Sequence, residues 1–214
     1  MRLIVDNDVL FKGACYGLLR SLVSAVCSLG DGIGILGAAR YVVKKKLSSA
    51  RLRGSIKLAL VAFSDFLAAS VELEPLTEEQ ETAADLEFQA LKRGWSLDVG
   101  ESQLCAILVH RGIPLMLTGD KRAISALEKL VDVDARLLKA CGKVLCLEQA
   151  FVSVVTRDGV GLTREAVCAE PEVDKTLTVC FGCTSGAASK GDHLDGLRSY
   201  VAWLRGEAPR VLVP

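Results

Sequence analysis

The stretch DVGESQLCAILVHRGIPLMLTGDKRA, residues 98–123, decides the fold class of this chain. Its first part has the apolar spacing of a helix that ends at Gly112. IPLMLT at 113–118 is typical of a short buried strand, and DKRAISALEKL at 120–130 is typical of a second helix. Helices that alternate directly with buried strands predict an α/β fold around a mostly parallel sheet.

The same alternation continues on both sides of this stretch. Further strands are predicted at 2–6, 32–36, 71–76 and 143–147, further helices at 9–30 and 77–94, and one or two helices over 38–70. The strand at 71–76 suits a sheet edge, and Thr77 with Gln80 has the spacing of a capping box. Residues 148–214 are predicted to be a helical C-terminal extension, packed on a domain formed by residues 1–147.

The composition argues against several classes of protein. Lys and Arg number 26, and so do Asp and Glu, so net charge gives no reason to expect a nucleic-acid or membrane partner. Asp6 and Asp8 interrupt the place of a signal-peptide core, and the most apolar later stretch, 58–71, is too short to cross a membrane. Eight cysteines without an export signal predict reduced thiols and a cytoplasmic location.

GIGILG at 32–37 matches the glycine spacing of a dinucleotide-binding loop but not its context. Such a loop follows a strand, and an acid that binds ribose comes about 20 residues later. Here the preceding residues have a helical pattern, and no acid occurs between Asp31 and Asp65. We therefore interpret these glycines as turns around a short strand and reject a dinucleotide site.

Three acids occupy positions that a parallel sheet would bring together. Asp6 ends the first strand, Asp120 follows the strand at 113–118, and Glu101 opens the helix before that strand. Ligand sites gather beyond the carboxyl ends of parallel strands, so one crevice is expected to hold all three. Crowded carboxylates repel one another, and a hard cation such as Mg²⁺ or Mn²⁺ relieves the repulsion. Each acid alone also fits a helix cap, and Asp98 with Glu101 fits a capping box.

LIVDNDVL at 3–10, followed by the stretch at 98–123, resembles the PIN-domain nucleases over about residues 1–147. The resemblance implies a three-layer α/β/α sandwich in which a small sheet lies between helices. It also implies hydrolysis of single-stranded RNA by a cluster of acids that binds Mg²⁺ or Mn²⁺. The family includes the toxins of toxin–antitoxin pairs, so an antitoxin or other protein partner and a homodimer are implied as well.

The family's site residues correspond to particular positions of this chain. The resemblance assigns metal binding and catalysis to Asp6, Glu101 and Asp120, further metal binding to Asp98 and Asp8, and a supporting hydroxyl to Thr118. One departure lies in the helix after the second strand, where the family has a Glu and this chain has Val43 or Lys44. A missing carboxylate weakens metal affinity, so an inactive PIN-like module that binds RNA or a protein is the alternative to an active nuclease.

Basic residues gather between positions 32 and 64, where no acid occurs. They would hold the phosphates of RNA, or they form a solvated helix face that the acids of residues 72–87 balance. The candidates for RNA binding are Arg40, Lys44, Lys45, Lys46, Arg51 and Arg53.

Cys180 and Cys183 have C-x-x-C spacing, and Cys168 precedes them. Such spacing occurs in zinc and redox sites. The favoured interpretation is that these cysteines are thiols with neither role.

Aromatic residues make up 5% of the chain, which leaves few platforms for stacking bases. Tyr200 and Trp203 are three positions apart and are predicted to share a helix face. We interpret them as anchors in a core or an interface.

Overall fold

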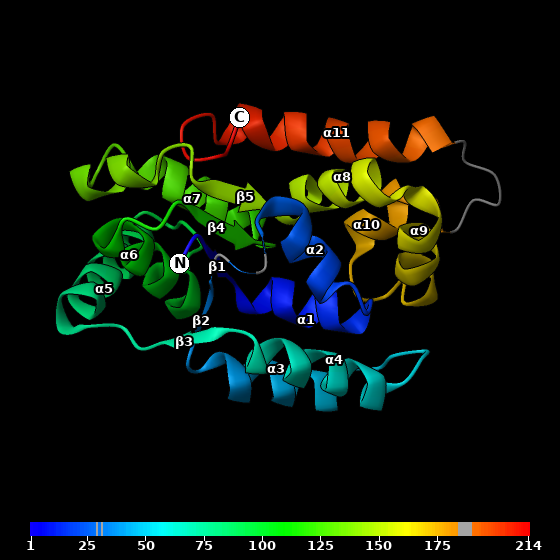
Figure 1. The fold of residues 1–214 in the computed structure, drawn as a ribbon. Helices are drawn as coiled ribbons and strands as arrows, with labels where there is room; N and C mark the ends of the chain where they lie inside the picture. The colour runs from blue at the N-terminus through cyan, green and yellow to red at the C-terminus, as the bar shows by residue number, and fades with distance from the viewer. Residues whose placement is uncertain (29, 31, 184–189) are drawn as a thin grey trace.

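The computed structural model describes residues 1–28, 30, 32–183 and 190–214. Short strands lie at its centre, with helices around them (Figure 1). The strands are β1 (Leu3–Val5), β2 (Ile33–Leu36), β3 (Val71–Leu73), β4 (Leu115–Thr118) and β5 (Val144–Cys146). The first helices are α1 (Asn7–Cys15), α2 (Leu19–Val26), α3 (Ala39–Ser48), α4 (Ile56–Ala68), α5 (Thr77–Lys92), α6 (Val99–Arg111) and α7 (Lys121–Leu130). The 3-10 helix η2 (Ala135–Ala140) follows, and then α8 (Leu147–Asp158), α9 (Val160–Ala169), α10 (Lys175–Cys180) and α11 (Lys190–Glu207).

The five strands form one sheet in the order β3-β2-β1-β4-β5, and all paired strands are parallel. The predicted α/β fold around a mostly parallel sheet is therefore confirmed, and β3 lies at the sheet edge as expected. From β1 the chain first moves outward through β2 to β3, and it then returns to build β4 and β5 on the other side. The strand order thus reverses between β1 and β4, which is where parallel sheets bind ligands.

Successive apolar residues of β1, β4 and β5 enter different hydrophobic cores, one on each face of the sheet. Leu3 and Val5 of β1 pack with residues of α1, α2, α4 and α8, whereas Ile4 packs with residues of α5, α6 and α7. All three side chains are buried. Because helices cover both faces, β1 and β5 are apolar throughout, whereas the edge strand β3 contains the charged Glu72.

The single helix predicted over 9–30 is wrong, because α1 and α2 are separate helices. Gly17 lies between them with a φ of +67°, a left-handed conformation that no α-helix contains and that glycine adopts without strain. Gly13 packs so closely against Leu19 that a Cβ added to it would lie 2.7 Å from Leu19 Cδ2. The apolar spacing of the two helices is nearly continuous and conceals this turn.

The capping box predicted for Thr77 and Gln80 is also wrong, by one position. The N-cap of α5 is Leu76, whose N–H donates to the Glu79 carboxylate at 2.8 Å. Arg111 holds that same carboxylate at 2.7 Å. Arg111, which lies on another helix, therefore helps to place the Glu79 carboxylate at the N-cap of α5.

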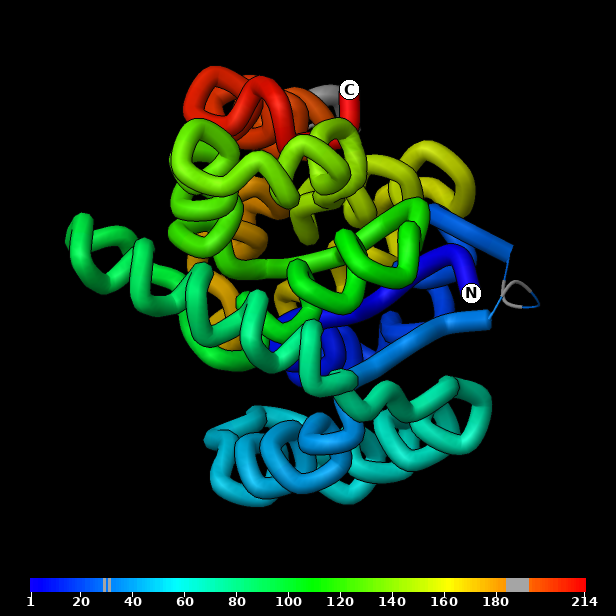
Figure 2. Tube along the Cα trace, turned by 90° about the vertical axis from the view of Figure 1, so that its left-hand side faces the viewer, coloured from blue at the N-terminus to red at the C-terminus, as the bar shows by residue number. Residues whose placement is uncertain are grey.

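Residues 148–214 pack on both faces of the sheet. Phe151 of α8 belongs to the core around α1, and Leu204 of α11 belongs to the core around α6. Near the chain end, the Val144 N–H donates to the Val211 carbonyl at 3.0 Å, which ties this region to β5. α11 lies at one end of the molecule and the α3–α4 pair at the opposite end, in both of two perpendicular views (Figures 1 and 2). Within the described ranges, no helix has the length and apolar character needed to cross a membrane.

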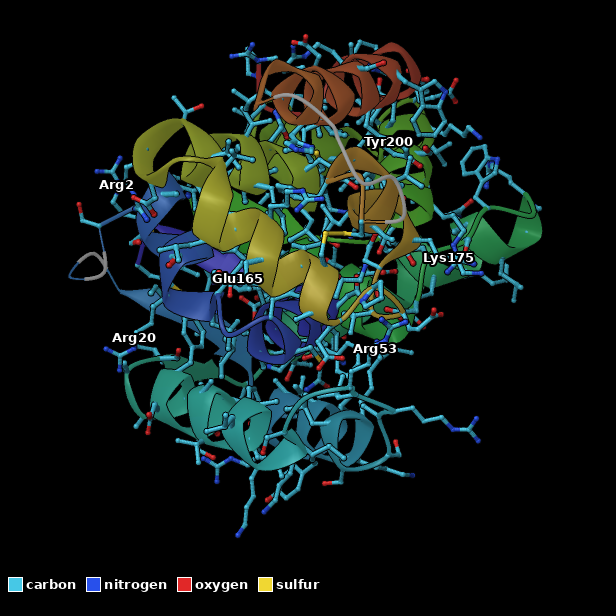
Figure 3. All side chains as sticks on the ribbon, turned by 90° about the vertical axis from the view of Figure 1, so that its right-hand side faces the viewer. Arg2, Arg20, Arg53, Glu165, Lys175 and Tyr200 are labelled. Carbon is cyan, nitrogen blue, oxygen red and sulfur yellow. A yellow bond between two sulfur atoms is a disulfide. The ribbon has the colours of Figure 1, made fainter. Side chains whose placement is uncertain are left out.

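A disulfide joins Cys168 of α9 to Cys183, which follows α10 (Figure 3). The expectation that all thiols are reduced is therefore wrong for this pair. Cys180 and Cys183 do not pair with each other, because Cys183 is bonded to Cys168 and Cys180 is a buried free thiol. The C-x-x-C spacing does not reveal this, because the partner of Cys183 comes from another helix.

Candidate active site

A cavity of about 610 Å³ lies beyond the carboxyl ends of β1, β2 and β4, where the strand order reverses. We call it the acid pocket because of the carboxylates that line it, which are Asp6, Asp8, Asp98, Glu101 and Asp120. These are the acids that the sequence assigned to the site, and the fold brings all of them to one cavity. Their elements are far apart in the chain, so the parallel topology alone produces the cluster.

Asp6 follows β1 directly and is almost fully buried. Thr118, at the end of β4, donates its hydroxyl proton to Asp6 Oδ2 at 3.0 Å and accepts the Asp120 N–H at 3.1 Å. Burial, followed by the charge of Asp8, raises the pKa of Asp6 to about 6. Thr118 thus fixes the Asp6 carboxylate against the turn between β4 and α7.

Glu101 lies in the first turn of α6 and is also almost fully buried. Its Oε2 accepts the Asp98 N–H at 3.0 Å, and its own N–H donates to Asp98 Oδ1 at 3.0 Å. The predicted capping box is therefore confirmed. Burial raises the pKa of Glu101 to about 8, and the charges of Asp98, Asp6 and Asp120 act in the same direction.

Asp120 differs from these two acids because it has a cationic partner. It caps α7 by accepting the N–H groups of Arg122 and Ala123, as its sequence position predicted, and it pairs with the Arg122 guanidinium at 3.0 Å. Burial acts to raise the pKa of Asp120, but the hydrogen bonds from Arg122 and the helix N–H groups outweigh it and hold the pKa below its usual value.

Asp8 connects the acid pocket to a neighbouring group of charges. Lys12 Nζ lies 2.5 Å from Asp8 Oδ2 and 2.7 Å from Asp174 Oδ2. Beside this pair, Lys121 Nζ lies 2.7 Å from Glu148 Oε1. We call the set of Lys12, Asp174, Lys121 and Glu148 the ion-pair layer. The lysines of this layer neutralise its carboxylates, whereas Asp6 forms no ion pair within the described residues.

The donor chemistry of the acid pocket suits a hard cation, because carboxylate oxygens dominate it and Asn7 adds an amide. In the described part of the chain, however, no three Asp, Glu, His or Cys side chains are arranged to hold a metal ion. The helix caps explain this, since Glu101 is turned to the Asp98 N–H and Asp120 to the start of α7. A metal bound here would have to draw these carboxylates away from their caps.

The basic residues predicted for RNA binding do not gather at the acid pocket. Lys46 lines it and lies 3.4 Å from Asp8 Oδ1. Arg40 pairs with Glu72, and with Lys44 it lines a different cavity. Lys45, Arg51 and Arg53 are exposed outside the acid pocket. Of the two residues at which the resemblance to the PIN-domain nucleases implies a Glu, Val43 is fully buried at the pocket wall and Lys44 is exposed outside the pocket lining.

Two charged residues beside the pocket were not singled out from the sequence. Lys12 follows Asp8 by four positions, a spacing that favours an ion pair on a helix and would have been a usable signal. Arg122 lines the acid pocket from the first turn of α7, and no pattern in the sequence sets it apart from other exposed arginines.

Comparison of the chain with known protein families, with curated proteins and with solved structures gives no match. The interpretation of the acid pocket therefore rests on its own residues.

Proposed function

We propose that the protein is a PIN-like nuclease that hydrolyses single-stranded RNA in the acid pocket with the help of Mg²⁺ or Mn²⁺. One observation carries the proposal: Asp6 and Glu101 are both buried in a pocket that three other acids line, and in the described residues neither forms an ion pair. Burying a carboxylate without a partner costs several kcal/mol, roughly, so a fold that retains two of them gains from an external cation. A divalent ion is the ligand that matches their charge and hardness.

Some residues of the acid pocket would hold a cation, and others would hold a phosphate. Asp6, Glu101 and Asp120 would hold the ion, with Asp98 and Asp8 as further acids. A bound divalent ion supplies an activated water and stabilises charge on a phosphodiester. Thr118 keeps Asp6 in place, and Arg122 and Lys46 at the pocket wall offer positive charge to the phosphates of a substrate.

Calorimetry with Mn²⁺ tests the proposal, on the wild type, on Asp6→Asn and on Asp65→Asn. Asp65 is an exposed acid on α4 outside the acid pocket and serves as the matched control. We expect one ion to bind wild type and Asp65→Asn alike, and at least tenfold weaker binding to Asp6→Asn. Cleavage of a labelled single-stranded RNA should follow the same order and stop with EDTA. Equal binding by all three proteins, or none by the wild type, would contradict the proposal.

The wall formed by Val43 favours a second candidate function. Neither Val43 nor Lys44, the two residues at which the resemblance to the PIN-domain nucleases implies a carboxylate, adds an acid to the pocket, so it has fewer ligands than the resemblance implies for an active nuclease. A non-catalytic module that binds RNA or a protein would retain the fold without needing the metal. Mn²⁺ binding without cleavage of any single-stranded RNA would support this candidate over the nuclease.

A further inference from the structure

The two tryptophans of the chain, Trp95 and Trp203, line one groove of about 310 Å³. Trp95 lies in the connection between α5 and α6, and Trp203 lies on α11 with 53% of its surface exposed. Large aromatic surfaces left in water are uncommon and often mark binding sites, because burying them is strongly favourable. The tryptophan groove, as we call it, is lined chiefly by Trp95, Trp203, Lys121, Arg122 and Lys129.

Positive charges lie against the ring of Trp95. The Arg93 guanidinium is 5.5 Å from the ring centroid, and the Lys129 ammonium is 5.9 Å from it. Both basic side chains are exposed, so they remain available to a ligand. Against these charges, the groove lining contains one acid, Glu207.

The other wall has the same combination of aromatic and basic groups. Trp203 meets Tyr200 edge to face, with ring centroids 5.5 Å apart. Lys121 Nζ lies 4.9 Å from the Tyr200 ring. Figure 3 shows Tyr200 on α11, above the helices of the C-terminal region. Aromatic faces beside lysines and arginines are the chemistry that binds unpaired bases together with their phosphates.

Arg122 connects the tryptophan groove to the acid pocket. Its side chain lines both cavities, and it also lines a third cavity together with Lys12, Lys121, Asp8 and Asp120. The Arg122 side chain is 76% exposed while it contacts Asp120, so its guanidinium can reach a phosphate without losing that contact. A strand lying along this path would pass from aromatic faces to carboxylates past the Arg122 guanidinium.

We propose that the tryptophan groove binds the unpaired bases of a single-stranded nucleic acid, whose backbone passes Arg122 into the acid pocket. The direction of the strand rests on the proposed nuclease function, whereas binding in the groove needs only the groove itself. Paired bases of a duplex cannot stack on these rings, so the groove selects single strands. This assigns Trp203 a different role from the core or interface anchor that its spacing with Tyr200 favoured.

Binding of fluorescein-labelled oligo(U) of twelve nucleotides, followed by anisotropy in the presence of EDTA, tests the inference on the full chain. We expect Trp203→Leu to weaken binding about tenfold, because one stacking platform is lost. Trp203→Phe should recover most of the affinity. Lys129→Gln should weaken binding less and lower the salt dependence by about one ion. The intrinsic fluorescence of Trp95 should still be quenched in Trp203→Leu at saturating oligo(U).

Two exposed aromatic residues outside the groove provide matched controls. Phe88→Leu on α5 and Tyr41→Leu on α3 remove comparable surface, and Tyr41 also tests the basic face around Arg40 and Lys44. Unchanged binding in both variants supports the groove. Equal affinities for Trp203→Leu and wild type would overturn it, and so would loss of self-association in Trp203→Leu without loss of oligo(U) binding. The binding assay contains EDTA and so does not depend on cleavage. If the wild type binds oligo(U) in EDTA but cleaves no single-stranded RNA with Mn²⁺, the nuclease is overturned and the groove remains.

Discussion

The acid pocket and the ion-pair layer bury carboxylates to the same depth but treat their charges in opposite ways. Asp6 and Glu101 in the pocket are 4% and 6% exposed, and Asp174 and Glu148 in the layer are 8% and 0% exposed. In the layer, each carboxylate lies 2.7 Å from a lysine ammonium. In the pocket, Asp6 and Glu101 accept hydrogen bonds from a hydroxyl and an N–H group instead.

The pKa values record this difference. Burial acts to raise the pKa of Asp174, but the charge of Lys12 outweighs it and the pKa is lowered. In the pocket, burial raises the pKa of Asp6 to about 6 and that of Glu101 to about 8. A buried acid with its own lysine is complete without a ligand, and it contributes to the fold. A buried acid without one carries a free-energy cost that a cation from solution can remove. The same residue type is therefore structural in one place and available for a ligand a few ångströms away.

Removing the lysine of the ion-pair layer should have the largest effect on stability. Lys12→Met leaves Asp174 buried and unpaired and takes a cation from Asp8, so we expect a loss of about 3–5 kcal/mol in the free energy of unfolding. Urea denaturation monitored by circular dichroism measures it. Lys57→Met, at an exposed lysine of α4, is the control and should stay within about 0.5 kcal/mol of wild type.

A second substitution separates loss of the ion pair from loss of packing. Asp174→Asn keeps an acceptor for the Leu177 N–H at the start of α10 but removes the charge that Lys12 neutralised. Added to Lys12→Met, it should restore part of the lost stability. If the double variant is as unstable as the sum of the single ones, the layer does not act as a pair.

The pH dependence of the metal-free protein should distinguish the pocket from the layer. Asp6 and Glu101 have pKa values in the folded state that are raised above those of the unfolded chain. Between about pH 4.5 and 8 the folded protein therefore binds more protons than the unfolded one, and its stability falls as the pH rises. The slope should reach about 1.4 kcal/mol per pH unit for each of the two acids. Thermal unfolding between pH 5 and 8.5 measures it.

Glu101→Gln is the control for this pH dependence, because glutamine keeps the acceptor for the Asp98 N–H and has no charge. The variant should be more stable than wild type above pH 7, by about 1–3 kcal/mol, and should lose most of the slope between pH 6 and 8. A stability that does not change with pH in this range, as acids ionised in both the folded and the unfolded state produce, would show that Glu101 is ionised without cost. Saturating Mn²⁺ should flatten the wild-type profile if the ion occupies the pocket.

The acids of the pocket could be predicted from the sequence because two local rules combine. A carboxylate at the end of an apolar strand, as at Asp6, and one in the first turn of a helix, as at Glu101, are visible in single segments. The alternation of helices and strands then predicts a parallel sheet, which fixes where strand ends meet. The convergence of these acids needed no knowledge of side-chain contacts.

The ion-pair layer and the tryptophan groove could not be predicted in this way. Lys12 of α1 pairs with Asp174 at the N-cap of α10, and Trp95 of a loop lines the same groove as Trp203 of α11. Each contact depends on how the C-terminal helices pack on the sheet, and no periodicity within a segment encodes that packing. For the same reason the turn at Gly17 was missed, since the residues around it keep a helical apolar pattern.

Lys46 at the wall of the acid pocket offers the smallest and sharpest test of the comparison. Its ammonium lies 3.4 Å from Asp8 Oδ1 and 4.2 Å from the centroid of the Phe11 ring, and half of the side chain is exposed. An exposed pair of this kind contributes at most about 0.5 kcal/mol, so Lys46→Gln should leave stability nearly unchanged. It nevertheless removes a positive charge from the pocket, so Mn²⁺ should bind about threefold more tightly at low salt.

Calorimetry with Mn²⁺ at two salt concentrations measures this change. The gain should shrink at high salt, because screening weakens the interaction between the lysine and the ion. Lys45→Gln, at the next residue of α3 and outside the pocket lining, should not alter the affinity. If Lys46→Gln and Lys45→Gln bind Mn²⁺ equally, the ion does not interact with the charge at the pocket wall. It would then have to bind elsewhere, and the unpaired acids Asp6 and Glu101 would need another explanation.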